Sequence, residues 1–143
     1  MLTDRDRRLV AYASDMIRKY FIEDEHHVAC ALRCGGKKYP ALHLDSSGID
    51  VCAEPIALSN ALMAGESDFD TIVAVRWDGN PGSPPEVIAP CGDCRQLLIE
   101  YCPEVRVILD DGQGEHITVS ASDLVPYPYL KKTSRLARGK FRP

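Results

Sequence analysis

Hydrophobic residues recur along the first third of the chain with two different periods. Between residues 4 and 21 apolar side chains recur at i, i+3 and i+4 spacing, which predicts an amphipathic helix. Two short apolar segments follow at 28–33 and 38–44, and Gly35 and Gly36 lie between them. Short apolar runs joined by a glycine pair are typical of a β-hairpin, so the pattern predicts a helix followed by two paired strands.

The rest of the chain alternates between helical and extended patterns. We expect helices at 52–64 and 91–101, strands at 70–77, 105–109 and 115–119, and a short helix running from Ser122 or Asp123 towards Pro126. The segment 78–90 is rich in proline and glycine and predicts a long loop. This order of elements predicts an α/β protein with a mixed sheet covered by helices.

Length and composition exclude several classes of protein. With 143 residues, 45% of them hydrophobic, the chain can bury a core without disulfide bonds. It has no apolar run approaching the roughly 18 residues of a membrane helix, and no hydrophobic segment follows the charged N-terminus. We therefore expect neither a membrane span nor a secretory signal, and we expect a cytoplasmic location.

Charge is distributed unevenly along the chain. The net charge is −4, yet residues 131–143 contain lysines and arginines and no acidic residue, so residues 1–130 are more acidic than the chain as a whole. An acidic body repels a phosphate backbone, which argues against nucleic acid as a partner. The basic tail at 131–143 is either solvated or in contact with phosphates or a neighbouring subunit.

Three of the six cysteines lie in two short motifs, each at the start of a predicted helix. These motifs are Cys-Ala-Glu at 52–54 and Pro-Cys-Gly-Asp-Cys at 90–94. Cysteines at i and i+3 share one helix face, and a helix N-terminus stabilises thiolates. Two such helices can direct three thiolates to one zinc ion and leave its fourth position open for water. The alternative is that the cysteines are structural and buried.

Glu54 follows Cys52 by two positions, and residues at i and i+2 of a helix point to different sides. The two side chains can share a site only if the metal lies beyond the helix end. There Glu54 can take a proton from a zinc-bound water and pass it to a substrate nitrogen. The alternative is that Glu54 only stabilises the helix N-terminus, an effect of about 0.3–1 kcal/mol.

Cys-Ala-Glu followed by Pro-Cys-x-x-Cys resembles the zinc-dependent cytidine deaminase family, including its blasticidin S deaminase branch. The resemblance implies a three-layer α/β/α sandwich with a mixed five-stranded sheet, in a single zinc domain at 1–130. It implies that Cys52, Cys91 and Cys94 bind Zn²⁺ and that Glu54 is catalytic. The implied reaction is hydrolytic deamination of a free aminopyrimidine nucleoside or nucleoside-like compound, with release of ammonia.

The resemblance also implies the substrate contacts. The backbone of Ala53 and the carbonyl of Ala89 would contact the base and its departing amine. His26 begins the segment that replaces the family's Phe-Pro-Val-Gly. His43-Leu44-Asp45 stands where members that bind cytidine have Asn-x-Glu. His26, His43 and Asp45 are therefore candidate substrate contacts with altered sugar-side chemistry.

Two further positions bear on this family pattern. Tyr129 takes the place of an aromatic residue that packs at a neighbouring subunit's site in many members, so a homo-oligomer, dimer or tetramer, is implied. Pro55 stands where three-cysteine members often have arginine. We expect the two helix N-termini and Arg95 to compensate for the charge of three thiolates instead.

Several functions stay open at this point. The deaminase substrate is either cytidine-like or a nucleoside antibiotic such as blasticidin S. A non-catalytic zinc or binding module would need a fourth protein ligand, such as His43 or Cys102. A deaminase that edits nucleic acids is disfavoured by the acidic body.

Overall fold

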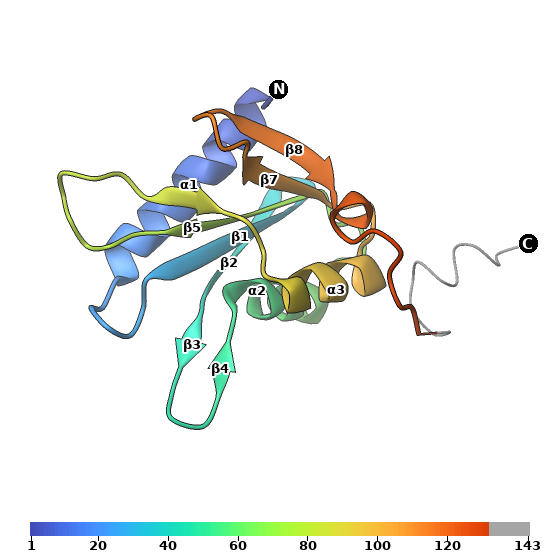
Figure 1. The fold of residues 1–143 in the computed structure, drawn as a ribbon, viewed down its shortest axis with the longest axis horizontal. Helices are drawn as coiled ribbons and strands as arrows, with labels where there is room; N and C mark the ends of the chain where they lie inside the picture. Colours follow the sequence, from blue (N-terminus) through green and yellow to red (C-terminus); the bar gives the residue numbers. More distant parts are fainter. Residues whose placement is uncertain (132–143) are drawn as a thin grey trace, which may run out of the picture.

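A mixed β-sheet forms the middle layer of the protein in the computed structural model, which describes residues 1–131 (Figure 1). Its strands follow the order β2-β1-β5-β7-β8, and β6 pairs with β5. The pairing of β5 with β7 is parallel, and the other pairings in this sheet are antiparallel. The strands are β1 (Val28–Cys34), β2 (Lys37–Leu42), β5 (Thr71–Arg76), β6 (Glu86–Ile88), β7 (Arg106–Asp110) and β8 (His116–Ser120).

Helices cover both faces of this sheet (Figure 1). Helix α1 (Asp4–Tyr20) packs against one face, and α2 (Ala53–Met63) and α3 (Gly92–Tyr101) lie side by side on the other. The predicted three-layer α/β/α sandwich is confirmed. Five strands form the continuous path of the sheet, and the short β6 is an addition that the sequence pattern did not predict.

The predicted first helix forms as expected because it can be both capped and buried. Thr3 and Asp6 make a capping box, in which each side chain accepts a hydrogen bond from the other residue's backbone N–H. Leu9, Ala13 and Ile17 lie on one stripe and are fully buried against the sheet. The helix ends at Tyr20, one residue before the predicted end.

The first hairpin also forms as predicted. Strands β1 and β2 pair from Ala29–Leu42 to Cys34–Lys37, and Gly35 has a φ of 60° in the connecting turn. Side chains of β1 alternate between the two cores, with Cys30 facing α2 and α3, and Ala31 facing α1. Burial on both faces explains why the apolar run in this strand is unbroken.

Two segments differ from the prediction. The expected strand at 38–44 ends at Leu42, and Leu44–Asp45 (β3) pairs instead with Asp50–Val51 (β4) in a separate hairpin (Figure 1). The chain leaves the main sheet at His43, whose buried side chain is hydrogen-bonded to the backbone of His27. In the predicted loop 78–90, β6 forms because β5 leaves an edge open beyond the part that pairs with β7.

The C-terminal region begins with a 3₁₀-helix at Ala121–Leu124 instead of the expected helix from Ser122 or Asp123. The predicted basic tail at 131–143 lies outside the described residues from position 132 onwards. Within the described part of the chain, no helix is long and apolar enough to cross a membrane.

A buried ionic cluster ties α1 to the sheet at the end of β1 that precedes the first hairpin turn. Arg33 donates to Asp6 at 2.9 Å and to Asp70 at 2.7 Å, and Arg106 donates to Asp6 at 2.9 Å. Burial by itself raises the pKa of Asp6, but the Thr3 backbone and Arg33 donate hydrogen bonds that outweigh it and lower the pKa to about 2. Asp6 is therefore held ionised in the folded protein.

Candidate active site

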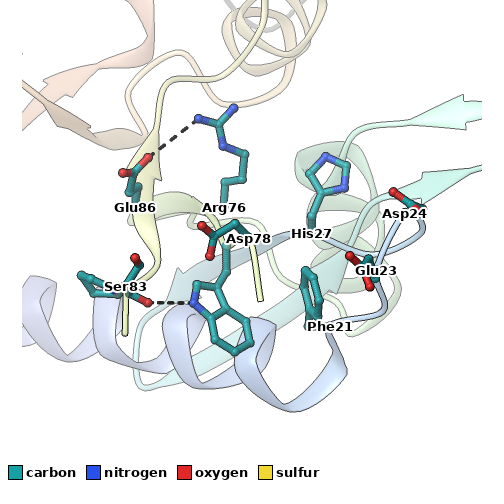
Figure 2. Close-up of a pocket in the computed structure, with 10 residues that line it drawn as sticks. Phe21, Glu23, Asp24, His27, Arg76, Asp78, Ser83 and Glu86 are labelled. Atoms are coloured by element: carbon teal, nitrogen blue, oxygen red, sulfur yellow. Dashed lines mark hydrogen bonds and ion pairs between the residues drawn. The ribbon is translucent and has the colours of Figure 1, made fainter. Parts of the chain in front are cut away.

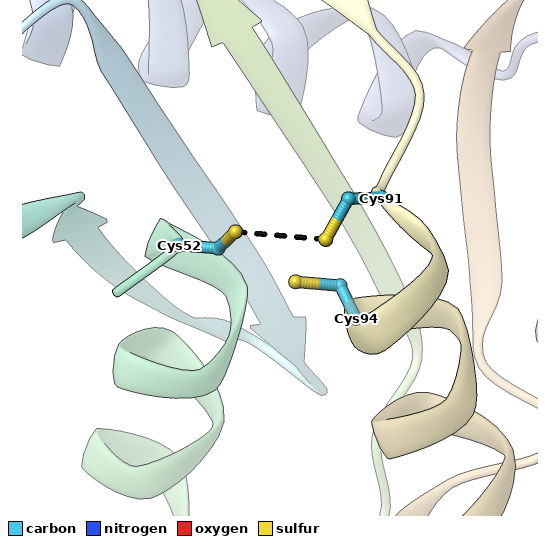
Figure 3. A group of neighbouring side chains, drawn as sticks. All are labelled: Cys52, Cys91 and Cys94. Atoms are coloured by element: carbon cyan, nitrogen blue, oxygen red, sulfur yellow. Dashed lines mark hydrogen bonds between the residues drawn. The ribbon is translucent and has the colours of Figure 1, made fainter. Parts of the chain in front are cut away.

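Three cysteines from two helix N-termini converge on the sheet face that carries α2 and α3 (Figure 3). Cys52 is the N-cap of α2 and Cys91 is the N-cap of α3, while Cys94 lies in the first turn of α3. The three sulfur atoms lie within 4.8 Å of one another, and Cys52 Sγ is 3.6 Å from Cys91 Sγ. The structure thus brings together the cysteines that the two motifs singled out.

The local backbone explains why the sulfurs are available. Both N-cap residues have extended backbone angles, and neither side chain caps its own helix. The sulfurs therefore point across the gap between the helices, as Figure 3 shows. Burial raises the pKa of Cys91, but the backbone N–H of Cys94 donates to its sulfur and brings the pKa below the ordinary value. This is the stabilisation expected of a helix N-terminus.

The donor set fits zinc. Three thiols are soft ligands that zinc prefers, and within residues 1–131 no further His, Cys, Asp or Glu joins the group. The two residues considered as a fourth ligand lie elsewhere. His43 Nε2 accepts the backbone N–H of His27, and Cys102 is the C-cap of α3, at the opposite end of that helix.

Glu54 lies in the first turn of α2, and only 5% of its surface is exposed. Its carboxyl group accepts a hydrogen bond from the Cys94 thiol, so it lies against the thiol cluster. Burial raises the pKa of Glu54 above its ordinary value. A buried carboxyl group with a raised pKa, next to three thiols, is suited to accepting and returning a proton.

A pocket of about 150 Å³ opens beside these groups. Its lining includes several predicted residues, namely Cys52, Cys91, Glu54, Ala53, Ala89 and His43. Sequence reasoning missed Val28, Ile88 and Asp50, which also line it. Ile88 lies on the unpredicted strand β6, and Asp50 on the unpredicted hairpin, so no local signal pointed to either.

Three other predicted contacts lie outside the lining of this pocket. Asp45 is exposed and pairs with Asp50 across the β3–β4 hairpin. The ring of His26 lies 6.1 Å from that of His43. The side chain of Tyr129 is 84% exposed, and its carbonyl accepts a hydrogen bond from Gln96 at 2.7 Å.

His43 has one fixed protonation pattern. Its side chain is 7% exposed, and its Nε2 accepts the backbone N–H of His27 at 3.0 Å. Accepting this bond requires a lone pair on Nε2, so the imidazole is neutral and carries its proton on Nδ1. Burial, and then the neighbouring His27, lower the pKa of His43 in agreement with a neutral ring. Within residues 1–131, Nδ1 has no hydrogen-bond partner, so it is a free donor.

Arg95 forms hydrogen bonds that hold the turn of the second cysteine motif. Its Nε donates to the carbonyl of Pro90 at 2.9 Å, and its Nη1 reaches the carbonyl of Leu124 at 3.5 Å. These bonds connect α3 to the turn that carries Ala89 and Cys91. Arg95 thus holds the turn, and its expected role in compensating thiolate charge stays a prediction.

Comparison with known proteins gives a consistent result. Residues 3–109 match the family model described as the cytidine and deoxycytidylate deaminase zinc-binding region. The chain is 33% identical over 135 residues to blasticidin-S deaminase from Bacillus cereus, across 91% of this chain and 96% of that protein.

Solved structures agree with this match. Cytidine deaminase from Burkholderia pseudomallei superimposes with a TM-score of 0.67 at 32% identity, and the match covers 90% of this chain and 100% of that one. Cytidine deaminase from Bacillus anthracis superimposes with a TM-score of 0.74 at 21% identity, covering 86% and 88% of the two chains. The latter likeness concerns the fold.

Proposed function

The chain belongs to the cytidine and deoxycytidylate deaminase family, a family of zinc-dependent hydrolases that deaminate nucleosides, and we propose that Cys52, Cys91 and Cys94 hold its zinc ion. One observation carries this assignment, namely that two helix N-termini direct three sulfurs to within 4.8 Å of one another beside a buried carboxyl group. A bound zinc ion supplies Lewis-acid activation of water at neutral pH.

We assign the proton transfers to Glu54. The reaction adds water at the amino-bearing carbon of the base and expels ammonia, so a proton must reach a ring nitrogen and another must reach the leaving amine. The Glu54 carboxyl is buried against the thiols and has a raised pKa, so it can accept a proton from water and return it to the substrate. Burial also keeps bulk water from competing for these protons.

Two backbone groups orient the base. Ala53 and Ala89 line the same pocket, one at the start of α2 and the other shortly before α3. The carbonyl of Ala89 would accept an N–H of the departing amine, and the backbone of Ala53 would contact the ring. Arg95 holds this geometry through the neighbouring Pro90 carbonyl.

We propose a substrate that is nucleoside-like on its sugar side without being limited to ribose. His43 offers only its Nδ1–H to the pocket, where the resembling family members that bind cytidine have an asparagine with both a donor and an acceptor. Cytidine and blasticidin S both remain candidates, because relatives named for each match this chain. His26 and Asp45, which flank the pocket, would contact parts of the substrate outside it.

We also propose that the protein is a homo-oligomer in the cytoplasm. Tyr127 and Tyr129 are strongly exposed aromatic residues beyond the 3₁₀-helix, and a neighbouring copy that packs on them would bring Tyr129 to its site. The described cysteines are all free, which suits a reducing compartment. Light scattering of the wild type and of Tyr129→Ala tests the assembly, and a monomeric wild type would overturn it.

The assignment is tested by metal content and ammonia release measured on the same preparations. Wild type, Cys91→Ser and Cys34→Ala are purified, their zinc is determined by mass spectrometry, and cytidine, deoxycytidine and blasticidin S are offered as substrates. Cys34 is a matched control, because it is a buried cysteine on β1 outside the thiol cluster.

We expect about one zinc ion per chain in the wild type and in Cys34→Ala, with zinc and activity lost together in Cys91→Ser. Full zinc retention by Cys91→Ser would refute the ligand assignment. A wild type that carries zinc but releases no ammonia from any of the three compounds would refute the proposed substrate class.

A further inference from the structure

His43 lies where the chain leaves the main sheet, and both its backbone and its ring are bonded to the segment that leads into β1. Its backbone N–H donates to the Val28 carbonyl at 3.2 Å, and its Nε2 accepts the N–H of His27 at 3.0 Å. The His27 carbonyl accepts the N–H of Trp77 at 2.9 Å. The imidazole thus replaces the strand partner that β2 no longer supplies at this point, and both polar backbone groups of His27 are paired.

The same imidazole lines the catalytic pocket. The His43 side chain is 7% exposed, and its Nδ1–H has no partner within residues 1–131. Buried polar groups are nearly always hydrogen-bonded, so a buried donor in the wall of a pocket marks a place where a ligand supplies the acceptor. His43 lies nine positions before Cys52, and in this part of the chain it makes no hydrogen bond to the thiol cluster.

The two ring nitrogens of His43 have opposite roles, and a single proton serves both. In the neutral tautomer, Nε2 accepts the His27 N–H while Nδ1–H is a donor to the pocket. A second proton, taken from solvent, would place an N–H on Nε2. Two N–H groups would then oppose each other across the 3.0 Å that now separates the nitrogens. The imidazolium therefore cannot keep the present position of the ring.

Several titratable groups surround this ring. Its centroid lies 4.3 Å from that of the His27 ring and 6.1 Å from that of the His26 ring. Positive charge on those rings opposes protonation of His43, whereas the carboxylates of Asp45 on β3 and Asp50 on β4 favour it. The ionisable groups that share the pocket from the helix starts are Cys52, Glu54 and Cys91.

The neutral ring is favoured at neutral pH. Burial has the largest effect on the pKa of His43 and lowers it below the ordinary value of 6.5, and the charges of His27 and His26 lower it further. The ring is therefore neutral at pH 7, in agreement with the hydrogen bond that Nε2 accepts. His27 is exposed at a pocket of about 640 Å³ (Figure 2), so solvent borders the pair of rings and can supply a proton as the pH falls.

The β3–β4 hairpin begins directly after His43. Within the described residues, β3 and β4 pair with each other and with no other strand, and Ser46 closes their turn. The hairpin is therefore joined to the sheet through His43 at one end and to α2 at the other. An imidazolium released from His27 finds partners of opposite charge on this hairpin, in the carboxylates of Asp45 and Asp50.

We propose that His43 is a pH-sensitive binding residue, which offers its Nδ1–H to the substrate only as the neutral ring and leaves its position when Nε2 takes up a proton. The inference rests on the proposed function, because the acceptor belongs to the nucleoside-like substrate in the catalytic pocket. Substrate affinity should fall as the pH falls through the pKa of His43, since only the neutral ring binds. The asparagine of cytidine-binding family members does not titrate, so this pH dependence is particular to a histidine here.

The first measurement follows the ring itself and needs no turnover. Two-bond ¹H–¹⁵N correlation spectra of the zinc-loaded full chain distinguish the Nδ1–H tautomer, the Nε2–H tautomer and the imidazolium. The chain has four histidines, so the signals missing from His43→Gln identify His43. We expect the Nδ1–H tautomer at pH 7, a midpoint below 6.5, and a shift of the His27 backbone amide with the same midpoint. The Nε2–H tautomer, or a His27 amide that does not follow the titration, would overturn the proposal.

The second measurement is substrate affinity between pH 5 and pH 7. Kd for cytidine and for blasticidin S is measured by calorimetry with zinc-loaded Glu54→Gln, in which turnover is blocked, alone and combined with His43→Gln or His116→Gln. The amide of His43→Gln accepts and donates hydrogen bonds without titrating, and His43→Asn is a second non-titrating variant in case the longer amide disturbs folding. His116, on β8, is the control imidazole, because it lines neither pocket.

We expect Kd at pH 5 to exceed Kd at pH 7 by up to about tenfold in Glu54→Gln, because the substrate loses one hydrogen bond. The added His116→Gln should leave this ratio unchanged, and the added His43→Gln should reduce it to less than about twofold. An equal pH dependence with and without His43→Gln would overturn the inference, because other groups would then be its cause. Affinity that is constant with pH in Glu54→Gln would overturn it as well.

The two measurements separate this inference from the proposed function. If neither compound binds at pH 7 while the His43 ring and the His27 amide titrate together, the pH-sensitive ring is supported and the proposed substrate class is overturned. A Kd that depends on pH through His43, without ammonia release by the wild type, would support the inference and overturn the deaminase assignment.

Discussion

Polar and charged groups at the two ends of strands β1 and β5 differ in whether they have hydrogen-bond or ion-pair partners. At the end that carries Arg33 and Asp70, Arg33 is paired with Asp6 and Asp70 through its Nη2 and Nε. Its Nη1 is the exception, as the one buried side-chain nitrogen or oxygen without a partner found within residues 1–131. At the other end, the Nδ1–H of His43 and the carboxylates of Glu23 and Asp24, which line pockets or lie beside them (Figure 2), have no partner within residues 1–131. Satisfied groups stabilise the fold, whereas groups left unsatisfied at a cavity are available for ligands.

The largest effect in this comparison is expected from neutralising Glu54, the buried acid at the pocket end. Glu54→Gln should lower kcat by about 10²–10⁴-fold, because the amide cannot exchange protons. Its zinc content should match that of the wild type, and its melting temperature should not fall, since a buried carboxyl with a raised pKa is removed. Ammonia release, metal analysis and thermal denaturation measure the three effects, and a fully active variant would contradict the mechanism.

The corresponding change at the other end should affect stability instead. Asp6→Asn leaves Arg33 and Arg106 without their shared carboxylate, and breaking a buried pair typically costs about 3–5 kcal/mol. Urea denaturation measures this loss, and kcat/KM per folded protein should be unchanged. Asp4→Asn is the control, because its carboxylate is on the same helix and is exposed. Equal losses in the two variants would contradict the importance of the buried cluster.

Low pH should remove the stabilisation that the ionised Asp6 provides. The folded pKa of Asp6 is about 2, below its ordinary value of 3.8, so its contribution is complete above pH 3.8 and is lost as the pH falls towards 2. The amount is on the order of 2 kcal/mol. The difference in unfolding free energy between wild type and Asp6→Asn should shrink from pH 5 to pH 2. Taking this difference cancels the effect of groups that titrate equally in both proteins. A difference that is constant with pH would contradict the assignment.

His43 sharpens the comparison at the pocket end. Phenylalanine keeps an aromatic ring next to His27 but removes the Nδ1–H donor, so His43→Phe should raise KM by about tenfold and change kcat little. The amide of His43→Gln can accept the His27 N–H and donate a hydrogen bond at the same time. The KM of this variant should therefore lie between those of the wild type and His43→Phe. A loss in kcat alone would indicate that His43 acts on the chemical step.

The helices and long strands could be read from the sequence because their patterns are local. The stripe of Leu9, Ala13 and Ile17 repeats at the helical period, and the run at 70–77 corresponds to β5 within two residues. Strand β6 could not be read, because its three residues after Pro84 and Pro85 become a strand only where β5 offers an open edge. The break at His43 was missed because a hydrogen bond to His27, a non-local partner, creates it.

The same division applies to the site. The cysteine motifs and Glu54 could be singled out in the sequence because metal chemistry restricts the residue types and their spacing. Asp50, Ile88 and the tautomer of His43 depended on how distant segments meet. A pocket of about 640 Å³ likewise arises from β5, β6 and two loops that no short motif connects.

The amino-acid order alone thus determined the layered α/β fold, the thiol motifs and the acid beside them, since each follows from periodicity or from ligand chemistry within a short segment. Only the tertiary structure decided which polar groups are paired and which are left facing a pocket. Pairing depends on contacts between residues far apart in the chain, such as Arg33 with Asp6 or His43 with His27, and local patterns carry no record of those contacts.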